Sequence, residues 1–289
     1  MRWDIFEDMK LIWRNFSLDF SKKTYIMGIL NITPDSFSDA CLYFDKSSAI
    51  ERAYQIVEEG ADIIDIGGES TRPGSEPIPI KEELRRVVPV IEAVSKNINI
   101  PISIDTYKSE VARAALDAGA SIVNDISGLR FDPKMSEVVS EYKVPVVIMH
   151  IKGTPKDMQK NPIYEALIPE IMDYFRSSIR MGIQAGISED LMIIDPGIGF
   201  GKTFEHNLEI INNLHEFALL KKPILIGPSR KAFIGKILGD APVSERLEGT
   251  AAAIAISIIK GANIIRVHDV KEMVKVAKVA DAIKRERLC

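Results

Sequence analysis

Short apolar runs and longer amphipathic stretches alternate along this chain from residue 25 to its end, and this alternation limits its possible folds more than any other feature. The eight apolar runs cover residues 25–31, 61–67, 101–106, 121–126, 145–150, 191–196, 223–227 and 263–268. The stretches between them, such as 47–59, 80–96 and 247–260, have helical spacing of apolar residues, and several end at a glycine in the C-cap position: Gly60, Gly119, Gly186 and Gly261. Apolar strands that are each followed by a helix indicate a parallel sheet covered on both faces.

The number of these units favours a closed barrel. Eight strand–helix units within 289 residues, with no linker rich in Ser, Gly or Pro between them, predict an α/β fold with a single (β/α)8 TIM barrel over residues 25–289. An open, doubly wound sheet is the alternative. Residues 1–24 contain Trp3, Trp13 and Phe16, and we expect this N-terminal extension to cap the bottom of the barrel as a short helix or hairpin.

Charge and cysteine content exclude several classes of protein. A net charge of −4 gives no general attraction to nucleic acid or to a membrane surface, so neither is expected as a partner. The two cysteines, Cys41 and Cys289, are too few for a disulfide framework and suit a reducing compartment. The first residues are partly acidic and no apolar segment approaches about 18 residues, so we expect a cytoplasmic protein.

Polar side chains stand where each apolar run ends. In a barrel these ends meet at one mouth, where active sites are built. A single Asp at such a position is often only a helix N-cap, but polar groups at all eight ends favour a functional site. The end residues considered are Asn31, Asp65, Asp105, Asn124, His150, Asp195, Lys231 and Arg266.

The first of two expected chemical zones is acidic. Asp105, Asn124 and Asp195 are flanked by apolar residues, so they would present carboxylates and an amide inside an apolar pocket. Such groups suit a flat heterocycle that is rich in N–H donors. Because buried carboxylates need a partner, either a cationic or donor-rich ligand or Lys231 should pair with them.

The second zone is basic and predicts a site for an anion. Its members are Arg72, Arg230, Lys231, Arg266 and His268. In barrels, the last two strands commonly build a phosphate site, and the amide oxygen of Asn31 on the neighbouring first strand could complete a Mg²⁺–phosphate arrangement. For Arg230, a role as solvated surface charge is the alternative.

Two other kinds of chemistry are conceivable for the histidines and for Lys231. The four histidines lack metal-ligand spacing, which argues against zinc hydrolase chemistry. Lys231 could form a Schiff base, as in barrel aldolases. Neighbouring carboxylates are expected to raise its pKa, which argues against that role.

Long, ordered segments of the chain carry a family resemblance. They are MGILNITPDSFSD at 27–39, DIGGESTRPG at 65–74, SIDT at 103–106, NDIS at 124–127, MH at 149–150, GTPKDM at 153–158, DPGIGFGK at 195–202, SRK at 229–231 and RVHD at 266–269. Together they resemble the dihydropteroate synthase family of folate biosynthesis, from about residue 16 to the C-terminus. The resemblance implies a (β/α)8 barrel that joins 6-hydroxymethyl-7,8-dihydropterin diphosphate to 4-aminobenzoate with Mg²⁺, giving 7,8-dihydropteroate and diphosphate.

The resemblance also implies roles for particular residues. The expected pterin site consists of Asp105, Asn124, Met149, Asp195, Phe200 and Lys231. The expected diphosphate site consists of Asn31, Arg72, Arg266 and His268, with Asn31 as the metal ligand. The expected aminobenzoate site consists of Phe37, Thr71, Pro73 and Ser229. Asp105, Lys231, Arg266 and His268 are the expected catalytic residues, and a homodimer is expected through helices on the barrel wall, with the apolar run 251–259 as one candidate and barrel core as its alternative role.

Two departures and two rival functions accompany this resemblance. Ala40 and Cys41 stand where the family pattern has a pair of glycines, and Pro228 restricts the backbone before Ser229. One rival is a methyltetrahydrofolate methyltransferase-like barrel, which would not need the segments GESTRPG and SRK. The other is a pterin-binding protein without catalytic activity.

Overall fold

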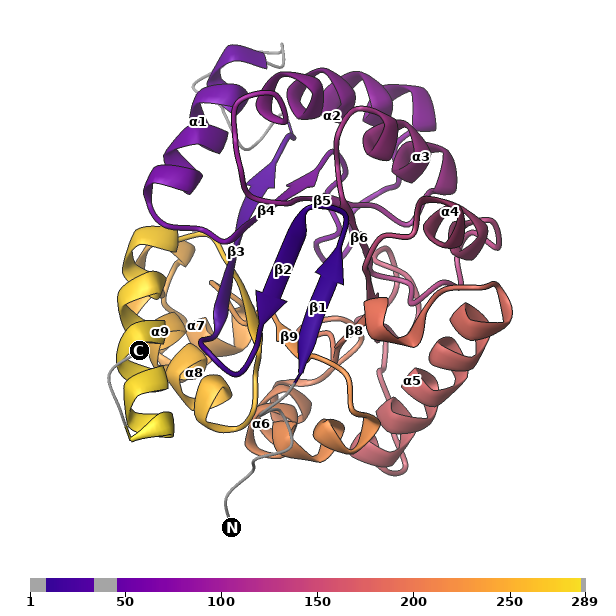
Figure 1. Cartoon of the computed structure of the whole chain (residues 1–289). Coiled ribbons are helices and arrows are strands. Elements are labelled where there is room, and N and C mark those ends of the chain that lie inside the picture. Colours follow the sequence, from indigo (N-terminus) through magenta and orange to yellow (C-terminus); the bar gives the residue numbers. More distant parts are fainter. Residues whose placement is uncertain (1–8, 34–45, 287–289) are drawn as a thin grey trace.

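The chain forms a barrel of parallel strands surrounded by helices in this computed structural model, which describes residues 9–33 and 46–286 (Figure 1). The barrel strands are β3 (Tyr25–Asn31), β4 (Ile63–Gly67), β5 (Ile102–Asp105), β6 (Ile122–Asp125), β7 (Val146–Met149), β8 (Met192–Asp195), β9 (Leu225–Ile226) and β10 (Ile264–Val267). Their order is β8-β7-β6-β5-β4-β3-β10-β9, and a parallel bridge between Ile194 and Ile224 joins the two edges. The predicted (β/α)8 barrel is therefore confirmed, and the open sheet is excluded.

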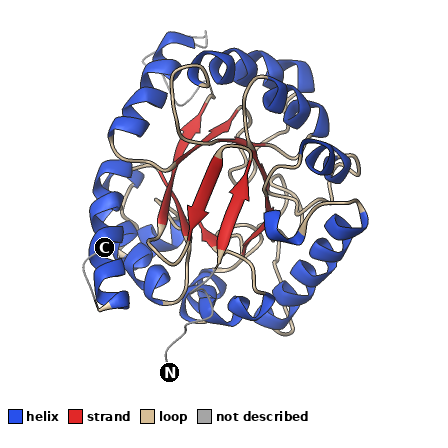
Figure 2. Cartoon of the chain, in the orientation of Figure 1, coloured by secondary structure: helices blue, strands red, loops and turns tan. Residues whose placement is uncertain are grey.

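Helices form a ring outside the strands (Figure 2). They are α1 (Lys46–Glu58), α2 (Ile80–Val94), α3 (Ser109–Asp117), α4 (Met135–Tyr142), α5 (Leu167–Gln184), α6 (Phe204–Asn212), α7 (Ala232–Ile237), α8 (Leu247–Ile259) and α9 (Val270–Arg285), with 3-10 helices at Glu189–Leu191, Leu214–Leu220 and Val243–Glu245. At the predicted C-caps the backbone takes the positive φ that glycine favours, for example 116° at Gly119. Within the described ranges, we find no helix with the length and hydrophobicity needed to cross a bilayer.

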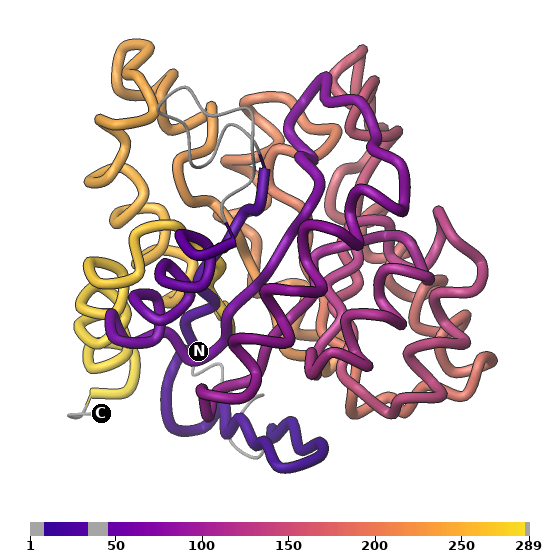
Figure 3. Tube along the Cα trace, turned by 90° about the horizontal axis from the view of Figure 1, so that it is seen from above, coloured from indigo at the N-terminus to yellow at the C-terminus, as the bar shows by residue number. Residues whose placement is uncertain are grey.

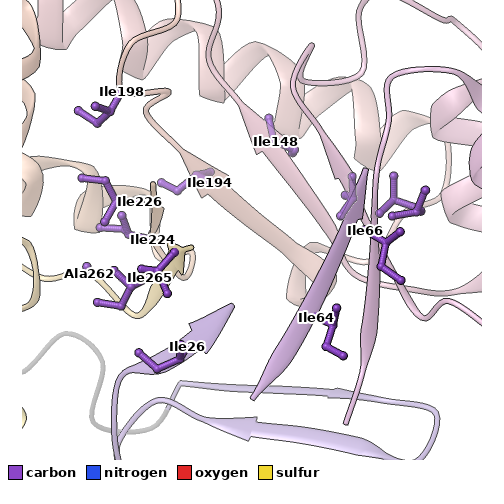
Figure 4. Close-up of a cluster of buried hydrophobic side chains, with 14 of the residues drawn as sticks. Ile26, Ile64, Ile66, Ile148, Ile194, Ile198, Ile224, Ile226, Ala262 and Ile265 are labelled. Atoms are coloured by element: carbon purple, nitrogen blue, oxygen red, sulfur yellow. The ribbon is translucent and has the colours of Figure 1, made fainter. Parts of the chain in front are cut away.

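Alternation along the strands divides the core into two regions. Residues such as Ile26, Ile64 and Ile66 point outward and belong to the apolar layer between the sheet and the helices (Figure 4). The intervening residues, such as Met27 and Ile63, fill the lower part of the barrel interior. The inward positions nearer the C-terminal end of each strand are not part of this apolar cluster and can carry polar side chains.

A hairpin covers the lower end of the barrel. β1 (Lys10–Trp13) pairs antiparallel with β2 (Phe16–Asp19), and both strands cross in front of the barrel in Figure 1. Leu11 and Trp13 pack into the same cluster as the lower interior residues Met27 and Ile63. The hairpin lies at one end of the molecule when the view is turned by 90° (Figure 3). The division of the chain into an extension of residues 1–24 and a barrel of residues 25–289 stays a prediction.

Adjacent residues of β1 test whether the hairpin stabilises the barrel. Leu11 is fully buried and Ile12 is 66% exposed. Leu11→Ala is expected to lower the free energy of unfolding by about 2–5 kcal/mol, because it leaves a cavity over the barrel interior. Ile12→Ala, the matched control, is expected to stay within about 0.5 kcal/mol of the wild type. Urea unfolding followed by circular dichroism checks this, and equal losses in the two variants would contradict it.

Candidate active site

Five polar residues occupy inward positions above the apolar lower interior. They are Asp65, Asp105, Asn124, Asp195 and Arg266, from five different strands. Asp65 follows Ile63 by two positions and Asp195 follows Ile193 by two, so the strand period turns each carboxylate to the same side as its apolar neighbour. The register places Asp105 beside Asn124 and Met149 beside Asp195. These groups therefore share the upper part of the barrel interior.

Arg266 holds two buried carboxylates together. Its Nε donates to Oδ2 of Asp65 at 2.6 Å, and its Nη2 donates to Oδ2 of Asp105 at 2.6 Å. Asn124 Nδ2 also donates to Asp65 Oδ2, at 3.0 Å. The protein partner of Asp105 is therefore Arg266 and not Lys231, while pairing with a ligand stays a prediction. The acidic and basic zones also do not separate, since they meet at this guanidinium.

The second oxygen of each of these carboxylates is unpaired. Oδ1 of Asp65 and Oδ1 of Asp105 are buried and have no hydrogen-bond partner. A buried acceptor without a donor destabilises the fold, so such oxygens call for a ligand that supplies N–H or O–H groups. Burial raises the pKa of Asp105, Arg266 opposes that rise, and Asp65 adds to it. Asp65 is absent from the residues predicted to bind a substrate, although its spacing from Ile63 indicates an inward position.

Lys231 and Phe200 form one wall of the site. Lys231 Nζ lies 4.4 Å from the centre of the Phe200 ring, within the range of a cation–π contact. Burial, with Arg266 as the next contribution, lowers the pKa of Lys231 to about 8, and Asp195 and Asp105 oppose this only in part. The expectation that carboxylates would raise this pKa is therefore wrong, because loss of water outweighs their attraction.

His268 and Ser229 meet at the ends of β10 and β9. Ser229 Oγ accepts a hydrogen bond from the His268 backbone N–H at 3.2 Å and lies 3.0 Å from His268 Nδ1. Burial, followed by Arg266 and Arg230, lowers the pKa of His268 to about 3. The imidazole is thus neutral near pH 7, so it enters the expected basic zone as a hydrogen-bonding group and not as a cation.

Arg230 is turned away from an anion-binding role. Its Nε donates to Asp269 Oδ2 at 2.9 Å, and its Nη2 bonds the other oxygen of Asp269. This two-point ion pair neutralises the guanidinium at the rim of the cavity. Arg230 is therefore removed from the predicted basic zone. Sequence alone could not show this, because Asp269 comes from a different strand end.

His150 does not deliver its ring to the mouth. Its Nδ1 lies 2.9 Å from Nζ of Lys202, which also donates to the carbonyl oxygen of Phe200 at 2.8 Å. Lys202 is buried, which lowers its pKa to about 7. Gly197 has a φ of 70°, and a Cβ there would lie 2.1 Å from the His150 carbonyl oxygen, so only glycine permits this approach. Lys202 ends the DPGIGFGK segment but is absent from the predicted site residues.

A cavity of about 1150 Å³ opens above these groups. This exceeds the usual range for a single small ligand, so there is room for two ligands side by side. Ten of the expected site residues line it: Asn31, Thr71, Arg72, Pro73, Asp105, Phe200, Ser229, Lys231, Arg266 and His268. Asn124, Met149 and Asp195 are buried beneath it. Phe37 lies outside the described residues, as does Cys41.

Residues that could hold a metal are few. Over the described ranges, no three His, Cys, Asp or Glu side chains come together as a metal site. Asn31 ends β3 and lines the cavity, where its amide offers one hard oxygen. One protein oxygen fits a Mg²⁺ ion that is held mainly by phosphate oxygens, and does not fit a metal bound by protein ligands alone.

Comparison with known proteins points to one family. The family model described as "Pterin binding enzyme" matches residues 27–268. The dihydropteroate synthase of Synechocystis sp. is 49% identical over 267 residues, which cover 92% of this chain and 92% of that protein. The Yersinia pestis dihydropteroate synthase in complex with a sulfonamide drug superposes with a TM-score of 0.91, at 40% identity, over 96% of this chain and 100% of the other. The Xanthomonas albilineans enzyme with 7,8-dihydropteroate has a TM-score of 0.85, at 36% identity, over 95% and 98%.

Asp195 allows a test of the cost of a buried charge. Burial raises its pKa from 3.8 to about 6. Below pH 3.8 the carboxyl is neutral in both folded and unfolded protein, whereas above about pH 6 the folded protein must hold a buried carboxylate, so stability is lost as the pH rises through this window. Asp195→Asn removes the ionisation and keeps an acceptor for the Gly197 N–H, which Asp195 Oδ1 accepts at 2.7 Å.

The variant is expected to gain about 1–3 kcal/mol over the wild type between pH 4 and pH 7.5. Urea unfolding at several pH values measures this difference. Asp173→Asn is the control, because its side chain is 75% exposed. A stability difference that does not change with pH in Asp195→Asn would refute the prediction.

Proposed function

The chain belongs to the dihydropteroate synthases of the pterin-binding enzyme family, and we propose that the barrel mouth carries out this family's reaction with the residues described above. The enzyme joins 6-hydroxymethyl-7,8-dihydropterin diphosphate to 4-aminobenzoate and releases diphosphate. The observation that carries the assignment of the site is the Asp65–Arg266–Asp105 arrangement, with its unpaired carboxylate oxygens beneath a large cavity.

The pterin ring suits the deep part of the site. Its N–H and NH₂ groups are donors that the unpaired oxygen of Asp105 can accept, and the neighbouring Asn124 and Asp195 offer further acceptors. Phe200 and Met149 would contact the flat faces of the ring, and Lys231 would donate to its acceptor atoms. A ligand that supplies these donors removes the cost of the unpaired buried oxygens.

The diphosphate suits the rim above the pterin. Arg72 and Arg266 supply positive charge there, and His268 supplies a hydrogen-bonding ring. Asn31 would hold a Mg²⁺ ion shared with the diphosphate. When bound, this ion would neutralise negative charge on the leaving group. Because His268 is neutral without a ligand, binding of an anion beside it is expected to raise its pKa.

The chemistry needs no nucleophile from the protein. The C–O bond between the pterin methylene and the diphosphate breaks, and its electron pair leaves with the diphosphate, whose charge Arg72 and Arg266 stabilise. The dihydropterin delocalises the resulting positive charge, and the carboxylate of Asp105 stabilises it. The lone pair of the arylamine nitrogen then forms the C–N bond, and this nitrogen loses a proton to solvent.

The aminobenzoate would occupy the outer part of the cavity. Thr71, Pro73 and Ser229 line that part, and we propose that they contact it with its carboxylate near Ser229. Phe37 completes the proposed contacts. The methyltransferase-like and catalytically idle alternatives can be told from the proposed reaction by one product, because neither would release diphosphate when both substrates are present.

An apolar face on α8 and α9 supports a proposed homodimer. Within the 251–259 run, Ile254 and Ile258 are buried against the barrel, whereas Ile256 and Ile259 are 50% and 43% exposed. Val279 of α9 adds to the exposed side, at 62%. An apolar patch of this kind on a barrel wall is typical of a protein interface.

We also propose a cytoplasmic location, because two cysteines in 289 residues suit a reducing compartment.

The site assignment predicts large losses of turnover. Lys231→Ala and Asp105→Ala are each expected to lower kcat by at least about 10²-fold, because each removes a preorganised charged group beside the reacting pterin. A coupled assay of diphosphate release, with and without 4-aminobenzoate, measures this. Arg113→Ala on the outer surface of α3 is the control and should keep wild-type turnover. Near-normal rates in both site variants would overturn the assignment.

The proposed dimer gives a separate prediction. Val279→Asp places a charge in the α8–α9 face and is expected to shift the protein from dimer to monomer at micromolar concentration. Sedimentation velocity measures the oligomeric state. Leu219→Asp is the control, because Leu219 is 70% exposed on another part of the surface. A monomeric wild type, or a dimer that persists in Val279→Asp, would contradict the proposal.

A further inference from the structure

Lys108 makes three short hydrogen bonds beside the active site. It follows β5, three residues after Asp105, and its side chain is 12% exposed. The ammonium donates to Glu69 Oε2 at 2.6 Å, to Glu83 Oε2 at 2.6 Å and to the carbonyl oxygen of Ile78 at 2.7 Å. A lysine has three N–H donors, so these acceptors use its full capacity.

The three acceptors lie at or beside the ends of one loop, residues 70–79, between β4 and α2, with Glu83 in the first turns of α2. Glu69 directly precedes the loop, and Ile78 lies near its end. Glu69 Oε2 also accepts from the Ile78 backbone N–H at 2.8 Å, so the two ends of the loop are joined at the point where Lys108 binds. This closed path is typical of an Ω-loop, whose ends lie close together.

This loop carries residues of the proposed substrate site. Thr71, Arg72 and Pro73 line the cavity, and Gly74 N–H donates to the Pro155 carbonyl oxygen at 2.9 Å on a neighbouring loop. Lys108 is not among the described residues that line the cavity. Its acceptor Glu69 does line the cavity, so any effect of Lys108 on the substrate must pass through Glu69 and the loop that follows it.

The burial of the cluster makes the charge of Lys108 important. The side chains of Glu69 and Glu83 are 5% and 1% exposed, and Glu83 Oε1 has no hydrogen-bond partner. Two buried carboxylates share one ammonium, so its removal would leave both without a positive partner. Tyr107 donates to Glu69 Oε1 at 2.6 Å from an uncharged hydroxyl. We call the contacts of Lys108 and Tyr107 with Glu69, Glu83 and Ile78 the clamp.

We propose that Lys108 is a positioning residue that holds the 70–79 loop ready for 4-aminobenzoate. This inference rests on the proposed function, because it assigns Thr71 and Pro73 to that substrate. Ordering a loop of this length at the moment of binding would cost several kcal/mol of conformational entropy. Because the clamp fixes the two ends of the loop on folding, less conformational entropy is lost when the substrate binds.

The test separates the two substrates. Lys108→Met is expected to raise KM for 4-aminobenzoate by at least about tenfold and to leave the Kd of a pterin without diphosphate within about twofold, measured by calorimetry. Lys108→Arg keeps the charge and is expected to bring KM back to within about threefold of the wild type. Lys156→Met is the matched control, since Lys156 is 61% exposed and pairs with Glu76 on the same loop, and it should leave KM unchanged.

Two further measurements keep the test decisive. Tyr107→Phe removes one hydrogen bond and no charge, so it should fold and raise KM in the same direction by a smaller factor, even where Lys108→Met fails to fold. Hydrogen exchange of the 70–79 amides should rise in Lys108→Met without any turnover, which keeps this inference testable if the wild type releases no diphosphate. Unchanged exchange, an unchanged KM in Tyr107→Phe, or equal losses for both ligands would overturn it.

Discussion

The fork of Arg266 between Asp65 and Asp105 is the interaction on which the site depends. Each carboxylate is held at 2.6 Å from the guanidinium, and the three residues come from β10, β4 and β5. β10 pairs with β3, which places the last strand beside the first ones, so the sheet must form before these charges meet. Breaking such a buried group by removing one partner would leave an uncompensated charge, at a cost of about 3–5 kcal/mol.

The same interior holds groups whose protonation is shifted in both directions. Burial raises the pKa of Asp105 and Asp195 and lowers that of Lys231 and Lys202. Opposite shifts have one cause, since loss of water disfavours every charged form. The unpaired carboxylate oxygens of Asp65 and Asp105 further lower the stability of the folded protein. Buried charges and unpaired acceptors of this kind are common at sites where function competes with stability.

The rim is organised differently from the interior. Interior groups are oriented by the strand period, whereas rim groups are oriented by contacts between loops. Lys108 ties the ends of the 70–79 loop together, and Asp269 draws Arg230 out of the anion-binding set. Each of these contacts joins residues that are at least 25 positions apart in the sequence. The arrangement of the rim therefore depends on ion pairs that no local pattern indicates.

The barrel could be predicted from the sequence, because apolar runs with β-branched residues and helical spacing are local properties that repeat along the chain. It also indicated most of the cavity wall, since polar residues at strand ends must meet at one mouth, and the family motifs narrowed their roles. The pairing of the polar groups, in contrast, could be seen only in the folded chain. Arg266 rather than Lys231 holds Asp105, and His150 turns to Lys202 behind the site. Pairing and pKa depend on distances across strands and on burial, and neither is encoded in the spacing of residues along one segment.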